Sequence, residues 1–367
     1  MDQEDLGKKH TSVMPSSEQG FDVSTAFKSD QTDMNDHRDL SLDYYFKSYS
    51  HLGIHQEMLK DQHRTKSYMD AVVRNKHLFK DKIVLDIGCG TGILSLFSAS
   101  AGAKHVYAVD FATITHQAQE IINENGYQDK ITVIRGKIEE IVLPVAHVDI
   151  IISEWMGYFL LYESMLDSVL FARDKWLVAD GLIFPDRAVM YIAGIEDSRY
   201  FEDKLHFWDR VYGFDMTPMK SLVHKEATVT HFDSEYVVTK SCPILDIDLK
   251  TVKIEDLDFV SDFSIKATHR ENLSALLVWF DTVFTACNVP VTLTTSPFEV
   301  KTHWKQAAFY LERPISLRAG DFINGTIAVR KNKKNPRSLD VLLKSRVSAK
   351  PWEERGQSQS SKLYFIS

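Results

Sequence analysis

One short stretch of this chain constrains its fold more than any other. An apolar run that carries one acid, Ile83–Ile87, leads directly into a turn with three glycines, Gly88, Gly90 and Gly92. Glycines let the backbone approach a ligand closely, and a helix that opens after such a turn presents unpaired N–H groups to it. A strand, a glycine turn and a helix in this order predict a cofactor cradle at the edge of a parallel sheet.

Apolar runs and helical patterns alternate around this cradle. Strands separated by helices form βαβ units, whose right-handed crossovers place the carboxyl ends of all strands at one rim, where ligands bind. The sequence therefore predicts a Rossmann-like α/β domain that, with helices before it, occupies residues 41–185. The expected strands are Ile83–Ile87, His105–Val109, Ile131–Ile134, Val148–Ile152 and Leu182–Phe184, and the expected helices are Ile93–Ala101, a segment up to Gly126, and Leu160–Trp176.

The pattern changes after Pro185. Alternating apolar and polar residues dominate from there, so we expect a β-sandwich or barrel domain over residues 186–367. An aromatic, charged helical segment begins at Ser198, and the polar residues after about Ser348 are expected to fray. The strands expected here are Ala188–Ala193, Tyr236–Thr239, Thr251–Ile254, Leu276–Phe280, Ala307–Tyr310, Phe322–Val329 and Leu339–Leu343.

The chain begins with a polar region. Residues 1–40 are rich in Ser, Asp and Gln and show no periodicity, which predicts a disordered tail. Tyr45 and Tyr49 then lie one helical turn apart and form an aromatic face, which either packs in the core or covers another part of the protein. A further helix is expected to carry Asp61 and Arg64.

The composition excludes several classes of protein. With 43 basic against 51 acidic residues the formal net charge is -8, which disfavours direct nucleic-acid binding and suits a cationic partner. The three cysteines are scattered, without the spacing of a metal site or a disulfide framework, so no metal is expected. No apolar run could span a membrane, and the acidic start is unlike a signal peptide. We expect a soluble intracellular protein that binds no membrane.

Acids near the glycine turn discriminate between two cofactors. Asp110 ends the second strand, where an acid accepts hydrogen bonds from both ribose hydroxyls. Asp86 would repel the pyrophosphate of NAD but could pair with the cationic end of S-adenosylmethionine, and the third glycine comes one residue earlier than in the NAD fingerprint. Glu139 is either an acceptor for the adenine amino group or, like Glu140, a solvated surface acid. These features favour S-adenosylmethionine over NAD.

Two more acids flank the next loop. Glu154 follows the apolar strand Val148–Ile152 closely, and Glu163 comes after the apolar, aromatic segment Trp155–Tyr162. Two acids at this spacing are usually independent surface groups, but the apolar segment keeps this loop against the protein. Carboxylates that converge in an apolar pocket repel each other and require a cation. A guanidinium fits best, because its planar fork of donors can meet both acids.

This pair suggests a reaction. Arginine loses its proton only above about pH 12, but two acids can draw its charge toward two nitrogens and leave the third more nucleophilic. That nitrogen would attack the sulfonium methyl group in line, in a step dominated by positioning and electrostatics. A histidine beside a tryptophan, His303-Trp304, is more often a core feature, and only the other motifs together place it at the site.

Taken together, these motifs resemble the type I protein arginine N-methyltransferases. The resemblance spans about Tyr44 to Arg346 and is greatest to the predominant dimeric member of the family, in a form similar to the fungal ones. It implies asymmetric dimethylation of arginine in Gly/Arg-rich RNA-binding proteins and histones, release of S-adenosylhomocysteine, a homodimer or higher oligomer, and a location in the nucleus and cytoplasm. The motifs that carry it are Tyr45-Phe46-x-x-Tyr49, the loop from Val84 to Gly92, the Ser153–Glu163 loop with its two glutamates, and Thr302-His303-Trp304.

The resemblance also implies roles for individual residues. Glu154 and Glu163 would clamp the substrate, and His303 would pair with Asp61 across the domain junction and relay a proton. An insertion of about residues 198–227 would be a helical dimerisation arm. Contacts to the cofactor are implied for His55, Arg64, Asp86, Gly88, Gly90, Asp110 and Glu139, with Arg64 at its carboxylate, and a substrate pocket for Tyr49, Met58, Met165 and Trp304, with Met58 associated with asymmetric products.

The sequence departs from the family pattern at three places. Asp110 stands where a glutamate is common, so a small strand shift or a water would be needed to reach the ribose. Val300-Lys301 replaces a Pro-Tyr-like pair and puts a positive charge where a basic peptide would run, and the segment from Asn335 to Asp340 differs in a way expected to affect only a loop. Two alternatives remain: a methyltransferase for another nucleophile, which would need only one of the two glutamates, and a silent scaffold for Arg-rich proteins.

Overall fold

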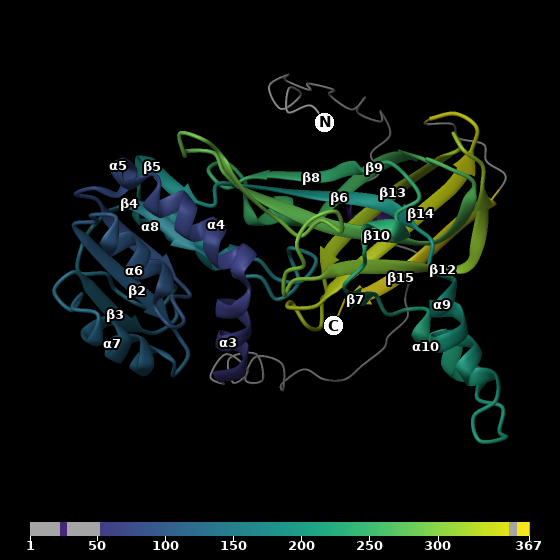
Figure 1. Ribbon diagram of the computed structural model, residues 1–367, viewed down its shortest axis with the longest axis horizontal. Coiled ribbons are helices and arrows are strands. Elements are labelled where there is room, and N and C mark those ends of the chain that lie inside the picture. The colour runs from purple at the N-terminus through teal and green to yellow at the C-terminus, as the bar shows by residue number, and fades with distance from the viewer. Residues whose placement is uncertain (1–22, 28–51, 352–357, 367) are drawn as a thin grey trace.

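The computed structural model describes residues 23–27, 52–351 and 358–366 of the chain (Figure 1). The predicted aromatic face with Tyr45 and Tyr49 therefore lies outside the described residues. Within them, no helix combines the length and apolar character that crossing a membrane requires.

The first half of the described chain is built on a five-stranded parallel sheet with the order β3-β2-β1-β4-β5. The central strand pairs on both sides, Leu85 with Tyr107 on one and with Ile151 on the other. The strand order reverses at β1 and β4, and this switch point is where parallel sheets of this type bind ligands. The strands are β1 (Ile83–Ile87), β2 (His105–Asp110), β3 (Ile131–Arg135), β4 (Val148–Ser153) and β5 (Leu177–Phe184).

Helices pack around this sheet, at the left of Figure 1. The predicted helix Leu160–Trp176 is wrong over its first six residues and starts only at Leu166. Leu160 and Glu163 adopt positive φ angles, 63° and 52°, which are incompatible with a right-handed helix. The helices are α3 (Leu52–Lys60), α4 (Gln62–Val73), α5 (Lys76–Phe79), α6 (Ile93–Ser100), α7 (Thr115–Glu124) and α8 (Leu166–Trp176).

The second half forms two antiparallel sheets, which confirms the predicted α/β domain followed by a β-sandwich-like domain. One sheet has the order β7-β12-β10-β6-β8 with β11 paired to β10, and the other has the order β15-β14-β13-β9. The strands of the first are β6 (Arg187–Ile195), β7 (Thr228–Thr230), β8 (Cys242–Asp248), β10 (Glu271–Phe284), β11 (Val291–Thr294) and β12 (Gln306–Leu317), and those of the second are β9 (Phe259–Lys266), β13 (Phe322–Lys331), β14 (Leu339–Ser348) and β15 (Ser358–Ile366).

Several predictions for this half are wrong. Tyr236–Thr239 makes only isolated bridges, and Thr251–Ile254 forms a turn that enters a 3-10 helix, because neither segment pairs along its length with a neighbour. The expected fraying after Ser348 is also contradicted, since β15 pairs with β14 over its whole length and buries Tyr364. β15 is the edge strand of its sheet, and backbone pairing with β14 orders it although much of its sequence is polar. The strands that the sequence analysis missed are β7, β8, β9, β11 and β15.

The predicted disordered tail contains an ordered piece. Val23–Ala26 forms a short helix, α1, and Ala26 and Phe27 are buried against the second antiparallel sheet. A four-residue helix has no stability of its own, so contact with the sheet is what orders it. Composition could not reveal this, because the apolar residues of the segment are too few to form a pattern.

A helical arm projects from the β domain, at the lower right of Figure 1. Its root packs against β12, where the rings of Tyr200 and Tyr310 stack. Toward its tip, Tyr212 and Phe214 are 98% and 71% exposed. Its elements are α9 (Ser198–Tyr200), a π-helical turn (Phe201–Leu205), 3-10 turns (His206–Asp209 and Thr217–Met219) and α10 (Lys220–Val223).

Candidate active site

A cavity of about 420 Å³ opens at the carboxyl ends of β1, β2 and β4. This volume is within the range of small-molecule sites. The glycine turn, the helices α3 and α4, the loop after β4 and three residues of the β domain all contribute to its wall. The predicted site residues that line it are His55, Met58, Arg64, Gly88, Gly90, Asp110, Glu139, Glu154, Glu163, Met165, His303 and Trp304.

The glycine turn has a backbone shape that other residues would not tolerate. Gly88 has a φ of 72°, and a Cβ there would lie 2.4 Å from the Cε of Met165. Gly90 has a φ of 53° and faces the ring of His55. Both positions combine a left-handed conformation with a close neighbour, so the turn keeps the cavity open only with glycine.

Asp110 holds the turn in place. Its Oδ2 accepts a hydrogen bond from the Gly90 amide (2.9 Å) and its Oδ1 accepts one from the Ala112 amide (2.8 Å). Burial raises the pKa of Asp110 although these hydrogen bonds oppose the shift. A carboxylate oxygen can accept more than one bond, so both oxygens, at the cavity wall, can still receive ligand hydroxyls.

Asp86 does not line the cavity. Its side chain is fully buried; Oδ2 accepts a hydrogen bond from the Ser95 hydroxyl (2.6 Å), and Oδ1 has no hydrogen-bond partner among the described residues. Burial raises the pKa of Asp86 to about 7. The structure therefore places this acid behind the glycine turn, as a buried acceptor with one unsatisfied oxygen.

Glu139 is exposed at the cavity rim. The hydroxyl of Ser168 donates to its Oε1 at 2.6 Å. Both residues line the cavity, so the hydrogen bond orients this carboxylate at the edge of the site.

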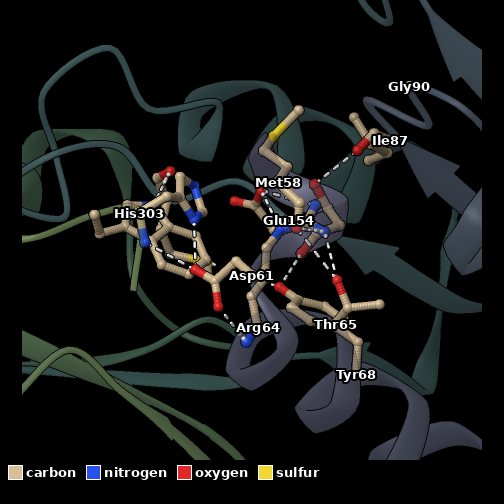
Figure 2. Close-up of polar contacts among 12 residues, drawn as sticks. Met58, Asp61, Arg64, Thr65, Tyr68, Ile87, Gly90, Glu154 and His303 are labelled. Carbon is tan, nitrogen blue, oxygen red and sulfur yellow. Dashed lines mark hydrogen bonds and ion pairs between the residues drawn. The ribbon is translucent and has the colours of Figure 1, made fainter. Parts of the chain in front are cut away.

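Glu154 is already paired with a guanidinium of the protein itself. Arg64 of α4 donates from Nε and Nη2 to the same oxygen, Oε2, at 3.0 Å each (Figure 2). The two side chains are only 7% and 8% exposed. Nearby, the hydroxyl of Tyr68 donates to the carbonyl of Ser153 (2.9 Å) and fixes the end of β4 against α4. The Oε1 of Glu154 is not used by Arg64.

The loop after Glu154 turns back on itself. The Gly157 amide donates to the carbonyl of Leu160 (2.9 Å), and the Tyr162 amide donates to the carbonyl of Tyr158 (3.0 Å). A Cβ on Gly157 would lie 1.6 Å from the Tyr162 carbonyl oxygen, so only glycine permits this closure. The turn brings both glutamates to the wall of one cavity, as the sequence predicted.

Glu163 is held from the β domain. Its amide donates to the carbonyl of Arg337 (3.1 Å), in the loop between β13 and β14. Burial raises the pKa of the Glu163 carboxyl, while the charge of Arg337 and a hydrogen bond with Tyr162 lower it in part. Arg337 also lines the cavity, which the sequence analysis missed. No local pattern could have linked this loop arginine to an acid in the other half of the chain.

The predicted contact between His303 and Asp61 is confirmed. Asp61 caps α4 by accepting the Arg64 amide at Oδ1 (3.0 Å), and its Oδ2 contacts both the amide and the Nδ1 of His303 (2.8 Å each) (Figure 2). Burial would raise the pKa of Asp61, but these hydrogen bonds outweigh it and leave the pKa below its ordinary value. Trp304 is buried beside His303 and donates from Nε1 to the Met156 carbonyl (3.0 Å).

A second groove of about 440 Å³ lies on the other side of Asp61 and His303. It is lined by α3, by His231 and by Lys301. Lys301 pairs with Asp233 at 2.7 Å, and both side chains are about half exposed. The positive charge that the sequence places near this groove is therefore partly neutralised. Across the described ranges, no cluster of three or more His, Cys, Asp or Glu is arranged to hold a metal.

Comparison with known families matches the two halves of the chain separately. Residues 186–350 match the arginine methyltransferase oligomerization subdomain, and residues 63–183 match the ribosomal protein L11 methyltransferase family.

Whole-chain relatives are also similar. Protein arginine N-methyltransferase 1 of Schizosaccharomyces pombe is 58% identical over 299 residues, which are 82% of this chain and 88% of that protein. The Saccharomyces cerevisiae protein of the same name is 47% identical over 325 residues, 88% of this chain and 93% of that one. Among solved structures, the Trypanosoma brucei PRMT1 enzyme-prozyme heterotetrameric complex with AdoHcy superposes with a TM-score of 0.84 at 46% identity, covering 87% of this chain and 100% of that chain.

Proposed function

This chain belongs to the type I protein arginine N-methyltransferases, and from that premise we propose what it makes and where it acts. It transfers methyl groups from S-adenosylmethionine to arginine in proteins. We propose that the products are monomethylarginine and asymmetric dimethylarginine, in Gly/Arg-rich RNA-binding proteins and histones, in the nucleus and cytoplasm. The observation that carries the proposal is the placement of Glu154 and Glu163 at the wall of one cavity beside the glycine turn.

The residues of the cavity fit the cofactor. The glycine turn leaves a space that a Cβ would fill, and Asp110 stands at the end of β2 to accept the ribose hydroxyls. Glu139 can accept from the adenine amino group at the rim. Asp86 places a buried carboxyl behind the turn, and its Oδ1 has no hydrogen-bond partner among the described residues. When bound, S-adenosylmethionine supplies a methyl group that is electrophilic because it is attached to a sulfonium.

Arg64 and His55 serve the other end of the cofactor. Both are buried residues of the N-terminal helices and both line the cavity. Arg64 donates two N–H groups to Glu154, and its Nη1 makes long hydrogen bonds to the Met58 carbonyl (3.5 Å) and the Thr65 hydroxyl (3.4 Å). A guanidinium has five donors, so one N–H of Nη2 remains for a ligand. Arg64 can therefore contact the cofactor carboxylate while it holds Glu154, which couples cofactor binding to the position of one substrate-binding acid.

The two glutamates bind and polarise the substrate guanidinium. Each accepts N–H groups of the arginine, draws positive charge toward them and leaves the remaining nitrogen facing the methyl group. Water is kept out by the buried loop residues and by Trp304. Burial raises the pKa of Glu163, which suits this acid to take the proton that leaves the methylated nitrogen. Asp61 and His303 fix the start of α4 and offer a proton path toward the second groove.

The shape of the pocket bears on the product. Met165 packs against Gly88, and Met58 lines the cavity next to Arg64. We assign Met58 to the choice of asymmetric product, because its side chain limits how a monomethylated arginine can turn for the second transfer. Trp304, which is also assigned to this pocket, lines the cavity, and Tyr49 lies outside the described residues.

In this proposal the helical arm binds a second copy of the chain and forms a homodimer. Aromatic side chains as exposed as Tyr212 and Phe214 are typical of a surface that a partner covers. A Tyr212→Asp, Phe214→Asp variant is expected to run as a monomer in light scattering while the wild type runs as a dimer. A dimer that persists in this variant would refute the assignment of the arm.

Mass spectrometry of a Gly-Arg-Gly peptide incubated with S-adenosylmethionine and the protein tests the function. Fragmentation separates asymmetric from symmetric dimethylarginine, and we expect the asymmetric form, absent in Glu163→Gln. Symmetric product would refute the assignment of Met58. Methylation of a different side chain, or binding of the peptide without methylation, would favour another nucleophile or the scaffold alternative.

A further inference from the structure

The N-terminal segment Val23–Phe27 is attached to the β domain at a specific place. Ala26 is 4% and Phe27 is 7% exposed, and both pack on Ala328 and Leu342. This apolar cluster is separate from the main core and lies on the outer face of β13 and β14. None of the residues of this segment lines the cavity, so the proposed chemistry does not account for its burial.

Phe27 contacts a charged residue as well as apolar ones. The guanidinium carbon of Arg330, at the end of β13, lies 3.8 Å from the centre of the Phe27 ring. The same guanidinium donates from Nε to Oδ2 of Asp340 (2.9 Å), and its Nη2 forms an ion pair with that oxygen at 2.9 Å. Asp340 is only 4% exposed. An aromatic ring over one face of an ion pair shields it from water and favours the flat orientation of the guanidinium.

Asp340 also contacts the loop between β13 and β14. Its second oxygen, Oδ1, accepts a hydrogen bond from Nδ2 of Asn332 (2.7 Å). The Oδ1 of Asn332 in turn accepts the amides of Lys334 and Asn335 (2.9 and 3.0 Å), and its own amide donates to the Ser338 carbonyl (2.9 Å). Asn332 therefore forms hydrogen bonds with three other residues of the segment 332–338, which we call the Arg337 loop.

The Arg337 loop reaches the catalytic acid. The carbonyl of Arg337 accepts the Glu163 amide (3.1 Å), and the charge of Arg337 acts on the Glu163 carboxyl. Glu163 has a positive φ of 52°, so its backbone relies on outside contacts to stay in place. Within the loop, the Oδ1 of Asn335 accepts the Arg337 amide (3.2 Å). Each step of the path from Phe27 to Glu163 is therefore a direct contact, and two of its links are made by opposite oxygens of one buried carboxylate.

We propose that Phe27 is a positioning residue for methyl transfer: by holding Arg330 against Asp340, it orders the Arg337 loop, which aligns Glu163. The inference rests on the proposed role of Glu163 in binding the substrate guanidinium. It gives the N-terminal segment a function in catalysis although the segment does not touch the cavity.

Phe27→Ala in the full-length protein tests this. We expect kcat to fall about threefold to tenfold, the scale on which such couplings act, with the KM for S-adenosylmethionine unchanged. The acid limb of the kcat–pH profile should move to higher pH, because Arg337 then lowers the pKa of Glu163 less. Amide hydrogen exchange in residues 332–338 should become faster. Unchanged exchange in this loop, or an unchanged kcat, would overturn the proposal.

Phe322→Ala is the matched control. It removes a phenylalanine at the other end of β13, where Lys266 lies over the ring at 5.7 Å, away from the Arg337 loop. Its kcat and loop exchange should equal those of the wild type, and an equal loss in both variants would reduce Phe27 to a general stabiliser. If Phe27→Ala does not fold, Arg330→Lys, which keeps the charge but loses the planar contact, replaces it.

Hydrogen exchange separates this test from that of the proposed function. It reports the order of the Arg337 loop without any turnover. Wild-type protein that does not methylate the peptide would refute the proposed function, whereas an active wild type with identical exchange in Phe27→Ala would refute only the role of Phe27.

Discussion

The two carboxylates of the site are held in different ways. Glu154 extends from a buried strand of the parallel sheet, and Arg64 on α4 binds it with two hydrogen bonds. Glu163, at the other end of the same loop, receives its support from Arg337 in the antiparallel domain. One acid therefore depends on the cofactor side of the molecule and the other on the substrate side.

The difference means that the pair is assembled where the two halves meet. Their alignment is fixed by a few polar contacts across the junction. Arg173 of α8 donates from Nη1 to the carbonyls of Leu249 and Val252 (2.8 and 2.7 Å), and Trp304 donates to the carbonyl of Met156. A shift of the β domain would move Glu163 and leave Glu154 in place.

The largest expected effect comes from removing either charge. Glu154→Gln and Glu163→Gln should each lower kcat about 10²- to 10³-fold, as is common when one preorganised electrostatic group is lost. Single-turnover methylation measures this. Glu140→Gln, an exposed acid on the same side of the molecule, should keep full activity. If only one of the two variants loses turnover, the proposal that both glutamates bind the substrate guanidinium is wrong.

Arg337→Gln removes the side-chain charge that acts on Glu163 and keeps the backbone carbonyl that accepts the Glu163 amide. We expect kcat to fall about tenfold, in line with loss of one charged partner. Burial already raises the pKa of Glu163, and without the opposing charge of Arg337 it should rise further. Turnover needs the ionised acid, so the acid limb of the kcat–pH profile should move to higher pH. A limb at the wild-type position would show that Arg337 does not act on this carboxyl.

Asp86→Asn tests the buried acid behind the glycine turn by its effect on thermal stability. The pKa of Asp86 is raised from 3.8 to about 7, so the folded state holds a proton that the unfolded state releases. That contribution is present below about pH 4 and is lost as the pH rises toward 7. The cofactor-free variant should therefore melt a few degrees above the wild type at pH 8, with a smaller difference at pH 5. Equal differences at both pH values would refute a buried, titrating Asp86.

The smallest effect is expected on the substrate side, from Lys301→Gln. Lys301 and Asp233 are about half exposed, and such pairs contribute roughly 0–1 kcal/mol. The KM of a Gly/Arg-rich peptide should change by less than about fivefold. A large decrease in KM would show that the lysine repels the peptide despite its partner.

The sequence predicted the parts of the site that local patterns encode. The glycine turn, the strand that ends before Glu154 and five strands of the β domain (β6, β10, β12, β13 and β14) follow from periodicity and residue type. The partnership of Asp61 and His303 followed from resemblance to a family.

The parts that were missed depend on contacts between distant segments. Residues 160–165 have the apolar composition of a helix, but the closure at Gly157 forces two of them into left-handed conformations. Arg337 acquires its place only when the β13–β14 loop meets the loop before α8. Phe27 and β15 are ordered by the sheet that they contact, and no short pattern in the sequence marks such docking.

The central claim is that Glu154 is held from the cofactor side and Glu163 from the β domain. Its most direct test is the affinity of Glu154→Gln and Glu163→Gln for S-adenosylhomocysteine, measured side by side by calorimetry. Glu154→Gln should bind at least about threefold more weakly, because Arg64 loses its charged partner next to the cofactor. Glu163→Gln should bind as tightly as the wild type. Equal affinities of the two variants would contradict the assignment of one acid to each side of the molecule.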